Sequence, residues 1–303
     1  MEWLWIPISL GAGLMQAVRT AAQKAINAHL STWMTTYVRS LFGLPVMAVY
    51  LWIVVSFEGL GVPVLHAEYL FHCAMTAITQ VVATYLLILL FQRANFAVGT
   101  MLTKTDIMQA AIIGSILFSE AISAIGWVAI GLTLVGVILI SARQLRGALT
   151  GGGGLGRLLG ARATLLGLGS GFGFCLSYLF LREASLSMED GSTVYRGAWS
   201  VVVVTTMQVV TLGLWLLARE RAEFAKLPGL IRPCLFIGLT SALGSIGWFT
   251  AMAMQNASYV KAVGQVEVVF TILISTLYFR ERITTAEYAG IATIVAAVLL
   301  FIF

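Results

Sequence analysis

Charged residues are scarce in this chain of 303 residues. Asp, Glu, Lys and Arg together make up only 10% of it, whereas they make up roughly 25% of an ordinary soluble domain. Hydrophobic residues reach 59%, so there is too little polar surface to cover them. A water-soluble globular fold is therefore excluded.

Cysteine and histidine are also rare, and neither is arranged for chemistry. The cysteines are Cys73, Cys175 and Cys234, and the histidines are His29, His66 and His72. The cysteines show no CxxC spacing, and the histidines show no HExxH-like spacing. A disulfide framework and a zinc site are not indicated. No Gly-rich phosphate loop follows a strand, which disfavours an ATP-driven pump. The sequence predicts neither an enzyme nor a cofactor.

Long apolar runs dominate what remains. A helix needs about 20 predominantly apolar residues to cross a bilayer, and the chain holds ten such segments, near residues 3–23, 32–56, 68–91, 96–118, 122–141, 163–181, 193–218, 233–253, 258–279 and 284–303. Charged residues, Gly or Pro mark most of the breaks between them. The pattern predicts an all-α integral membrane protein with ten transmembrane helices.

The longest polar interruption divides the chain into two similar halves. It runs from Arg143 to Arg162 and contains four consecutive glycines, which resist packing as a helix. We predict a first five-helix repeat at residues 1–142, a linker at 143–162 and a second repeat at 163–303. Paired residues support the duplication: Arg39 with Arg196, Asn95 with Asn256, Asp106 with Glu267 and Glu120 with Glu281. An odd number of spans per repeat inverts the second copy, as in many secondary transporters.

The positive charge of the chain, +5, lies mostly in loops between apolar segments. Anionic lipid headgroups attract basic residues there, so the lipid bilayer is the expected partner and nucleic acid is not. In a ten-span topology almost all loop Lys and Arg residues face one side, and only Arg182 faces the other. The positive-inside rule then places the linker in the cytoplasm and both termini outside. We expect a multi-pass protein of a prokaryotic inner membrane.

Ionisable residues within the apolar segments are the strongest functional signal. Such residues cost about 2.5–3.5 kcal/mol on insertion scales and usually face a cavity or a partner. Lys104 and Asp106 lie in the fourth segment, and Lys261 and Glu267 lie in the ninth. The two lysines, with Arg39, would favour a carboxylate or phosphate on the substrate. Asp106 and Glu267 would balance charge, bind an ammonium group or couple transport to protons. Alternatively, Lys104 only pairs with a carboxylate and locks two helices together.

Two helical stripes and one aromatic residue add weaker candidates. His72, Thr76, Gln80 and Thr84 recur every four residues in the third segment, so they share one face, and Gln80 is the candidate cavity residue. Gln16, Arg19, Thr20, Gln23 and Lys24 form a similar stripe in the first segment, although Arg19 and Lys24 could snorkel to the interface. Trp248 and Gln265 complete the substrate-binding candidates. Interhelical hydrogen bonding and ordinary aromatic packing are the alternatives for these residues.

Three further features carry a family resemblance. Arg39 and Arg196 come early in the second helix of each repeat, and Phe-x-Glu turns at Glu120 and Glu281 precede Gly- and Ala-rich fifth helices. In these features the chain resembles the drug/metabolite transporter superfamily, specifically its EamA-type ten-helix members. The resemblance implies alternating access around a central cavity lined mainly by the first four helices of each repeat. It also implies substrates such as amino acids, and termini in the cytoplasm, against the loop charges.

Together these patterns predict a secondary-active transporter of a small polar metabolite. An amino acid or another zwitterionic or anionic solute is the expected substrate, with proton or exchange coupling, and the protein is expected to be a monomer or a homodimer. A multidrug exporter of cations is the main alternative, but it should show a dominant buried carboxylate rather than surplus Lys and Arg. A channel and a scaffold are the remaining alternatives. Asn95 and Asn256 are expected to be helix N-caps, and Glu120 and Glu281 to be turn and charge-pair residues.

Overall fold

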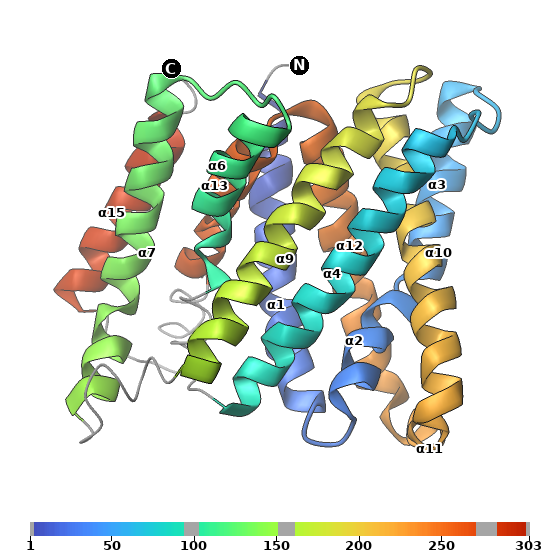
Figure 1. Cartoon of the computed structure of the whole chain (residues 1–303), viewed down its shortest axis with the longest axis horizontal. Coiled ribbons are helices and arrows are strands. Elements are labelled where there is room, and N and C mark those ends of the chain that lie inside the picture. The colour runs from blue at the N-terminus through green and yellow to red at the C-terminus, as the bar shows by residue number, and fades with distance from the viewer. Residues whose placement is uncertain (1–2, 94–102, 151–160, 271–283, 301–303) are drawn as a thin grey trace.

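The computed structural model describes residues 3–93, 103–150, 161–270 and 284–300. All regular elements within these ranges are helices, and the long ones lie side by side as a bundle between two ends of the molecule (Figure 1). Five are long and apolar enough to cross a membrane, and three shorter ones are also apolar. The all-α membrane fold is thereby confirmed. The total of ten transmembrane helices remains a prediction, because parts of the fourth and ninth segments lie outside the described residues.

The first half of the chain supplies six of these elements: α1 (Trp5–Ile26), α2 (Thr32–Leu41), α3 (Leu44–Glu58), α4 (Ala67–Arg93), α6 (Asp106–Leu117) and α7 (Ala124–Thr150). The second half supplies the others: α9 (Ala161–Leu186), α10 (Thr193–Arg219), α11 (Arg221–Phe224), the 3-10 turn η1 (Pro228–Leu230), α12 (Ile231–Met254), α13 (Ala257–Gly264) and α15 (Thr285–Leu300). In a bilayer every backbone polar group must be bonded internally, which apolar helices achieve within one segment.

Polar contacts at the two ends show how the halves are oriented. Ser31, at the start of α2, donates its hydroxyl to Glu220 at the end of α10. At the opposite end Ser192, at the start of α10, donates its hydroxyl to Glu58 at the end of α3. Helix α1 therefore finishes where α10 finishes, whereas α9 finishes where α10 begins. The first helices of the two halves run in opposite directions, as inverted repeats require (Figure 1).

Close contacts between small residues join the two halves. Helix α1 meets α12 at Ala12 and Gly247, and α4 meets α9 at Ala83 and Gly173. Helix α7 meets α15 at Gly136 and Gly290. Each of these three contacts pairs a helix of one predicted repeat with a helix of the other. Membrane helices associate through such small-residue contacts because lipid provides no hydrophobic drive.

One predicted equivalence between the repeats is not reproduced. Ser31 caps α2 and Ser192 caps α10, so these serines occupy matching places. Arg39 then lies about two turns into its helix, whereas Arg196 lies about one turn into its own. Arg39 bonds Gln80 inside the bundle, while Arg196 donates to the carbonyls of Ser185 and Met188 near one end. The pairing of Arg39 with Arg196 was therefore wrong by about one turn.

Candidate binding pocket

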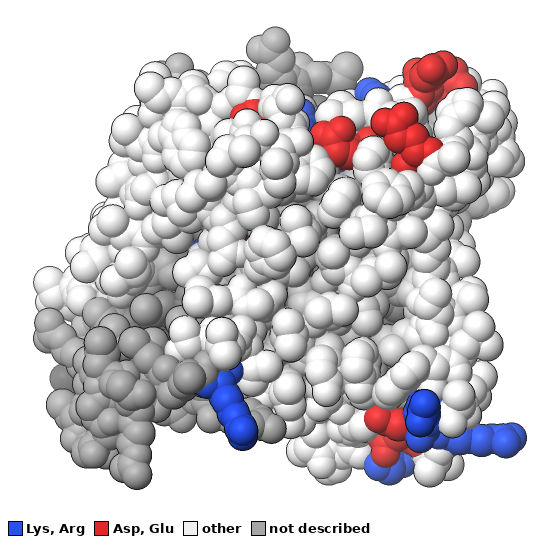
Figure 2. Space-filling view, in the orientation of Figure 1, with Lys and Arg blue, Asp and Glu red and all other residues white. Residues whose placement is uncertain are grey.

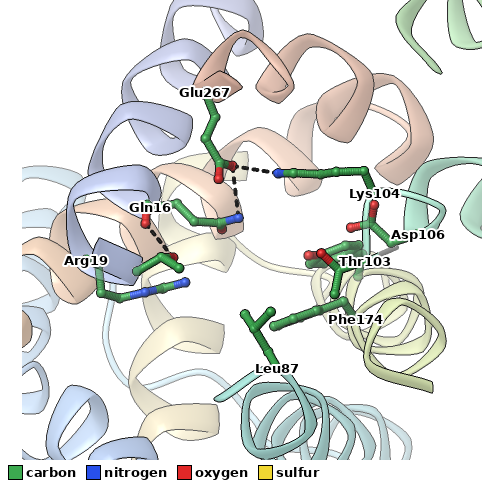
Figure 3. Close-up of a pocket in the computed structure, with 10 residues that line it drawn as sticks. Gln16, Arg19, Leu87, Thr103, Lys104, Asp106, Phe174 and Glu267 are labelled. Atoms are coloured by element: carbon green, nitrogen blue, oxygen red, sulfur yellow. Dashed lines mark hydrogen bonds and ion pairs between the residues drawn. The ribbon is translucent and has the colours of Figure 1, made fainter. Parts of the chain in front are cut away.

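A pocket lies among α1, α4, α6, α9 and the helical residues that follow α13 (Figure 3). About 410 Å³ of space not filled by atoms lies in and in front of it, and this volume includes open solvent. Its lining combines charged and apolar side chains from both halves of the chain: Gln16, Arg19, Thr20, Leu87, Thr103, Lys104, Asp106, Phe174, Tyr178 and Glu267. Seven of these ten side chains are polar or charged, and Leu87, Phe174 and Tyr178 supply the apolar part of the wall. Convergent polar groups beside apolar and aromatic side chains can fix the orientation of a small polar ligand.

The start of one helix and a break in another helix place carboxylates in this pocket. Asp106 is the first residue of α6, directly after the non-helical Lys104 and Thr105. Glu267 lies just after a break at Gln265, at the start of the helical residues 266–270. Thr and Asp favour helix starts, but the Thr105 side chain makes no capping hydrogen bond here and accepts one from Gln109 Nε2 at 3.1 Å instead. Helix N-termini at membrane depth stabilise negative charge.

Glu267 is the centre of a polar chain across the pocket. Its Oε2 lies 3.1 Å from Lys104 Nζ and accepts a hydrogen bond of 3.1 Å from Gln16 Nε2. Trp248 Nε1 in turn donates to Gln16 Oε1 at 3.0 Å. This polar chain connects α12 and α1 with the segments that carry Lys104 and Glu267. The Lys104–Glu267 pair itself joins the two halves of the protein.

A second lysine lies behind the pocket. Lys261 Nζ is 4.0 Å from Asp106 Oδ2, and it lies 4.4 Å from the ring centre of Tyr178 and 4.3 Å from that of Trp248. Both rings can stabilise the ammonium through cation–π attraction. The other oxygen of Asp106, Oδ1, is buried with no hydrogen-bond partner among the described residues.

Two arginines are buried without a carboxylate bound to them in the described part of the chain. Arg19 lines the pocket from α1, is 6% exposed, and its Nε has no hydrogen-bond partner there. Arg39 is 3% exposed and donates to Gln80 Oε1 at 2.6 Å. Gln208 also donates to Gln80 Oε1, at 2.8 Å, and accepts from Ser40 at 2.8 Å. Arg39 thus belongs to a polar cluster of α2, α4 and α10 whose other members, Gln80, Gln208 and Ser40, are neutral.

The pocket brings together only some of the residues that the sequence singled out. Lys104, Asp106 and Glu267 line it. The other five candidates do not: Lys261 and Trp248 lie one layer behind, Gln265 is fully buried beside Lys261, and Arg39 and Gln80 belong to the polar cluster. All their binding roles stay predictions.

Sequence reasoning missed several lining residues. The polar stripe of the first segment pointed to Gln16, Arg19 and Thr20, but none of them was chosen as a site residue. Nothing in the local pattern distinguishes Phe174 from other aromatic residues of apolar helices, and the same holds for Leu87 and Tyr178. The polar stripe of the third segment has another explanation, since Thr76 and Thr84 bond carbonyls of their own helix.

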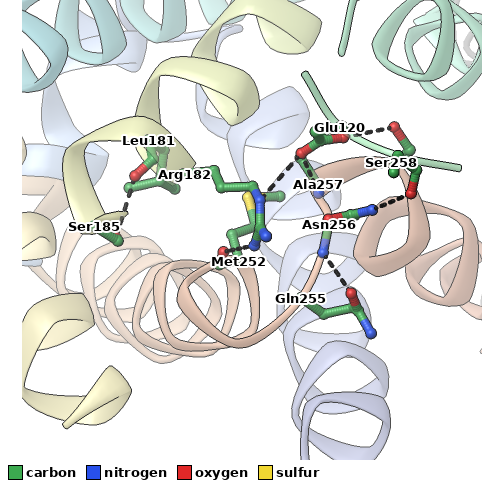
Figure 4. Close-up of polar contacts among 10 residues, drawn as sticks. Glu120, Leu181, Arg182, Ser185, Met252, Gln255, Asn256, Ala257 and Ser258 are labelled. Atoms are coloured by element: carbon green, nitrogen blue, oxygen red, sulfur yellow. Dashed lines mark hydrogen bonds and ion pairs between the residues drawn. The ribbon is translucent and has the colours of Figure 1, made fainter. Parts of the chain in front are cut away.

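A second polar network links the two halves of the chain beyond the C-terminal end of α6 (Figure 4). Arg182 Nε lies 3.3 Å from Glu120 Oε1, and that carboxylate also accepts from the Ala257 N–H at 2.9 Å and from Ser258 at 3.3 Å. Arg182 also donates to the Met252 carbonyl at 3.0 Å. Burial raises the pKa of the Glu120 carboxyl, although the Ala257 N–H and Arg182 act against this. Glu120 is therefore the expected charge-pair residue, and it joins the two halves.

The same network corrects one expectation about helix capping. Asn256 occupies the N-cap position of α13, but its side chain makes no capping bond. It donates instead to the Ala121 carbonyl at 3.0 Å, and Glu120 accepts the hydrogen bonds at the start of α13. The predicted capping role of the Asn256 side chain was wrong, because an ionised acceptor from another loop occupies that place. Asn95 and Glu281 lie outside the described residues.

Comparisons with known proteins agree with this architecture. The sequence pattern of the EamA-like transporter family matches residues 3–142 and again residues 161–303. A solved structure titled "Crystal structure of protein" has a TM-score of 0.71 with 13% sequence identity, and the similarity covers 99% of this chain and 96% of that one. At that identity the likeness shows the fold alone. No curated protein matches the sequence.

Proposed function

The chain belongs to the EamA-like transporter family, and we propose that it is a secondary-active carrier of a small zwitterionic or anionic metabolite. An amino acid or a related organic acid is the proposed substrate, and alternating access is the proposed mechanism. Members of this family are transporters rather than enzymes, so the proposal concerns the substrate and the mode of transport.

The observation that carries the proposal is the pocket between the two halves. Lys104, just before α6, and Glu267, just after the break at Gln265, meet there, with Arg19 and Asp106 beside them. Buried ionisable groups at membrane depth usually mark a substrate or ion pathway. Substrate sites of secondary transporters with inverted repeats typically lie between the repeats at discontinuous helices.

The position of the pocket relative to the network of Glu120 and Arg182 supports alternating access. Along α9 the lining residues Phe174 and Tyr178 precede Arg182, which belongs to that network. Along α1 the lining residues Gln16, Arg19 and Thr20 lie toward the helix end that is remote from that network. A carrier needs a site that is closed on one side at a time, and the network of Glu120 and Arg182 is the proposed closure on that side.

Counterflow in liposomes tests the proposal. Purified protein would first be screened by thermal shift against amino acids, organic acids, sugar phosphates and lipophilic cations. The best ligand would then be loaded into proteoliposomes, and uptake of the labelled compound would be followed. We expect saturable, accelerated exchange of a zwitterionic or anionic solute. Conductance at single-channel rates would contradict a carrier, and tightest binding of a lipophilic cation would favour a cation exporter.

The coupling ion can be tested at the carboxylates. Asp106 and Glu267 are the proposed proton-coupling groups, because a buried carboxylate can exchange protons during a transport cycle. We expect a pH gradient to drive uptake in the wild type and to lose its effect in Asp106→Asn, while exchange without a gradient persists. Uptake that ignores pH in both forms would remove Asp106 from this role.

A further inference from the structure

The buried charges around the pocket are not all matched. Lys104 lies against Glu267, and Lys261 lies near Asp106, so each lysine has a carboxylate. Within the described part of the chain, no carboxylate oxygen lies within 4.0 Å of an Arg19 nitrogen. Arg19 is therefore the lining cation without an ion-pair partner at that distance.

Arg19 is also directed into the pocket. Its side chain extends from α1 toward the space that Lys104 and Asp106 face from the other side (Figure 3). It is 6% exposed, and its Nε is buried without a hydrogen-bond partner among the described residues. A buried donor without a partner is costly, and a guanidinium at membrane depth more so. This arrangement is expected where a ligand supplies the missing acceptor.

The surrounding charges favour an anion at this position. Arg39 lies close enough to Arg19 for the two positive charges to repel each other, and Gln80, which accepts a hydrogen bond from Arg39, is neutral. Glu267 attracts Arg19, but its carboxylate is already bound to Lys104 and Gln16. The α1 side of the pocket thus carries positive charge that the acidic residues in the described part of the chain do not fully neutralise.

We propose that Arg19 is the residue that binds the anionic group of the substrate. Its planar guanidinium can hold a carboxylate through two parallel hydrogen bonds, while Leu87, Phe174 and Tyr178 contact the apolar part of the solute. The inference rests on the proposed function and narrows it, since a solute without an anionic group would lose this contact. A phosphate of a lipid headgroup has the same chemistry, so the experiment must separate the two sources.

A matched pair of probes tests this role directly. 4-Methylpentanoate and 4-methylpentanamide share one branched chain, which suits the apolar lining, and differ in the charge of one group. Binding of each would be measured by calorimetry to purified protein in phosphatidylcholine nanodiscs. We expect the wild type to bind the acid at least about tenfold more tightly than the amide, and Arg19→Gln to lose that preference. Arg19→Lys should keep part of it, because its charge remains but the fork geometry does not.

Arg196→Gln is the matched control. Arg196 also has a buried Nε without a hydrogen-bond partner among the described residues, but its guanidinium contacts carbonyls near one end of the bundle. We expect this variant to keep the preference of the wild type. Gel filtration would report folding. If Arg19→Gln fails to fold, Arg19→Lys decides: an unchanged preference for the acid overturns the proposal, and a preference reduced several-fold supports it.

The remaining outcomes separate the possible sources of the anion and the two proposals. Equal binding of acid and amide by the wild type overturns the role of Arg19. So does a thermal stabilisation by phosphatidylglycerol that disappears in Arg19→Gln without any preference for the acid, because Arg19 would then bind lipid. Acid binding that requires Arg19, without saturable counterflow, leaves the anion site standing and contradicts the carrier. Counterflow that is unaffected in Arg19→Gln supports the carrier and contradicts the anion-binding role of Arg19.

Discussion

Lys104 and Glu267 show what a buried ion pair contributes to this protein. Their side chains are only 7% and 10% exposed, so each charge has lost most of its contact with solvent. Attraction between two buried charges often does no more than offset the cost of desolvating them. The pair therefore adds little stability as a unit, but removal of one partner would leave the other charge buried alone.

This reasoning leads to a test that separates structure from transport. We expect Lys104→Met to lower the free energy of unfolding by about 3 kcal/mol and to abolish transport, because Glu267 keeps its charge without its ion partner. The double variant Lys104→Met/Glu267→Leu should regain most of the stability without regaining transport. Thermal unfolding in detergent and counterflow are the two measurements. Normal transport by the double variant would show that the pair only holds two helices together.

Residues in the pocket were predictable where their chemistry conflicts with their surroundings. Lys104, Asp106 and Glu267 stand out in the sequence because ionisable groups within apolar segments are costly. The sequence could not show which of these residues pair, because Lys104 pairs with a residue more than 160 positions away. Arg19 shows the same limit: the sequence allows it to reach the membrane surface, and only the packing of α1 buries it beside the pocket.

At the level of helices, the junction of α1, α12 and α13 depends on small residues. A Cβ atom on Gly264 would lie 2.1 Å from the Trp248 ring, and one on Gly13 would lie 2.8 Å from the Gly264 carbonyl oxygen. Trp248 in turn holds Gln16, which bonds Glu267. The positions of these glycines therefore set the position of the polar chain in the pocket.

We expect Gly264→Ala to be destabilising, because the new methyl group must displace the Trp248 ring or the helix. Overpacking of this kind costs about 1–3 kcal/mol. Gly131→Ala in α7 is the control, since a Cβ atom there meets nothing within 4 Å. Melting temperatures of both variants in the same detergent would check this. Equal melting temperatures would mean that the packing at Trp248 is more adaptable than the structure indicates.

Helix starts offer a second test at this scale. The Ser192 hydroxyl accepts a hydrogen bond from the Tyr195 N–H at 3.2 Å and also donates to Glu58. We expect Ser192→Ala to cost about 1 kcal/mol, the usual value for loss of an N-cap, and Ser192→Thr to stay close to the wild type because it keeps the hydroxyl. Chemical unfolding would measure both. A threonine variant as unstable as the alanine variant would contradict the capping role.

For the whole molecule, the distribution of charge predicts the orientation in the membrane. Exposed basic residues gather at the end where α10 finishes, among them Arg219, Arg221, Lys226 and Arg232, whereas Glu68, Glu189 and Asp190 are exposed at the other end (Figure 2). The positive-inside rule places the basic end in the cytoplasm. The proposed orientation then puts both chain termini outside.

Reporter fusions test this orientation. We expect alkaline phosphatase fused after Phe303 to be active in a bacterial host and green fluorescent protein at the same place to be dark, because the first enzyme works only outside the cytoplasm. Fusions within the linker near Gly152 should behave in the opposite way. Fluorescence at Phe303 together with phosphatase activity at the linker would reverse the orientation and agree with cytoplasmic termini.

The sequence by itself determined the class of the protein, because composition and the length of apolar runs respond directly to the bilayer. It also determined the duplication and the buried ionisable residues, which are local properties of the chain. Tertiary structure alone decided which charges meet, since ion pairs such as Lys104–Glu267 and Arg182–Glu120 join distant segments. It alone left Arg19 with no carboxylate oxygen within 4.0 Å among the described residues, because a charge imbalance of a pocket exists only once the helices that line it have packed.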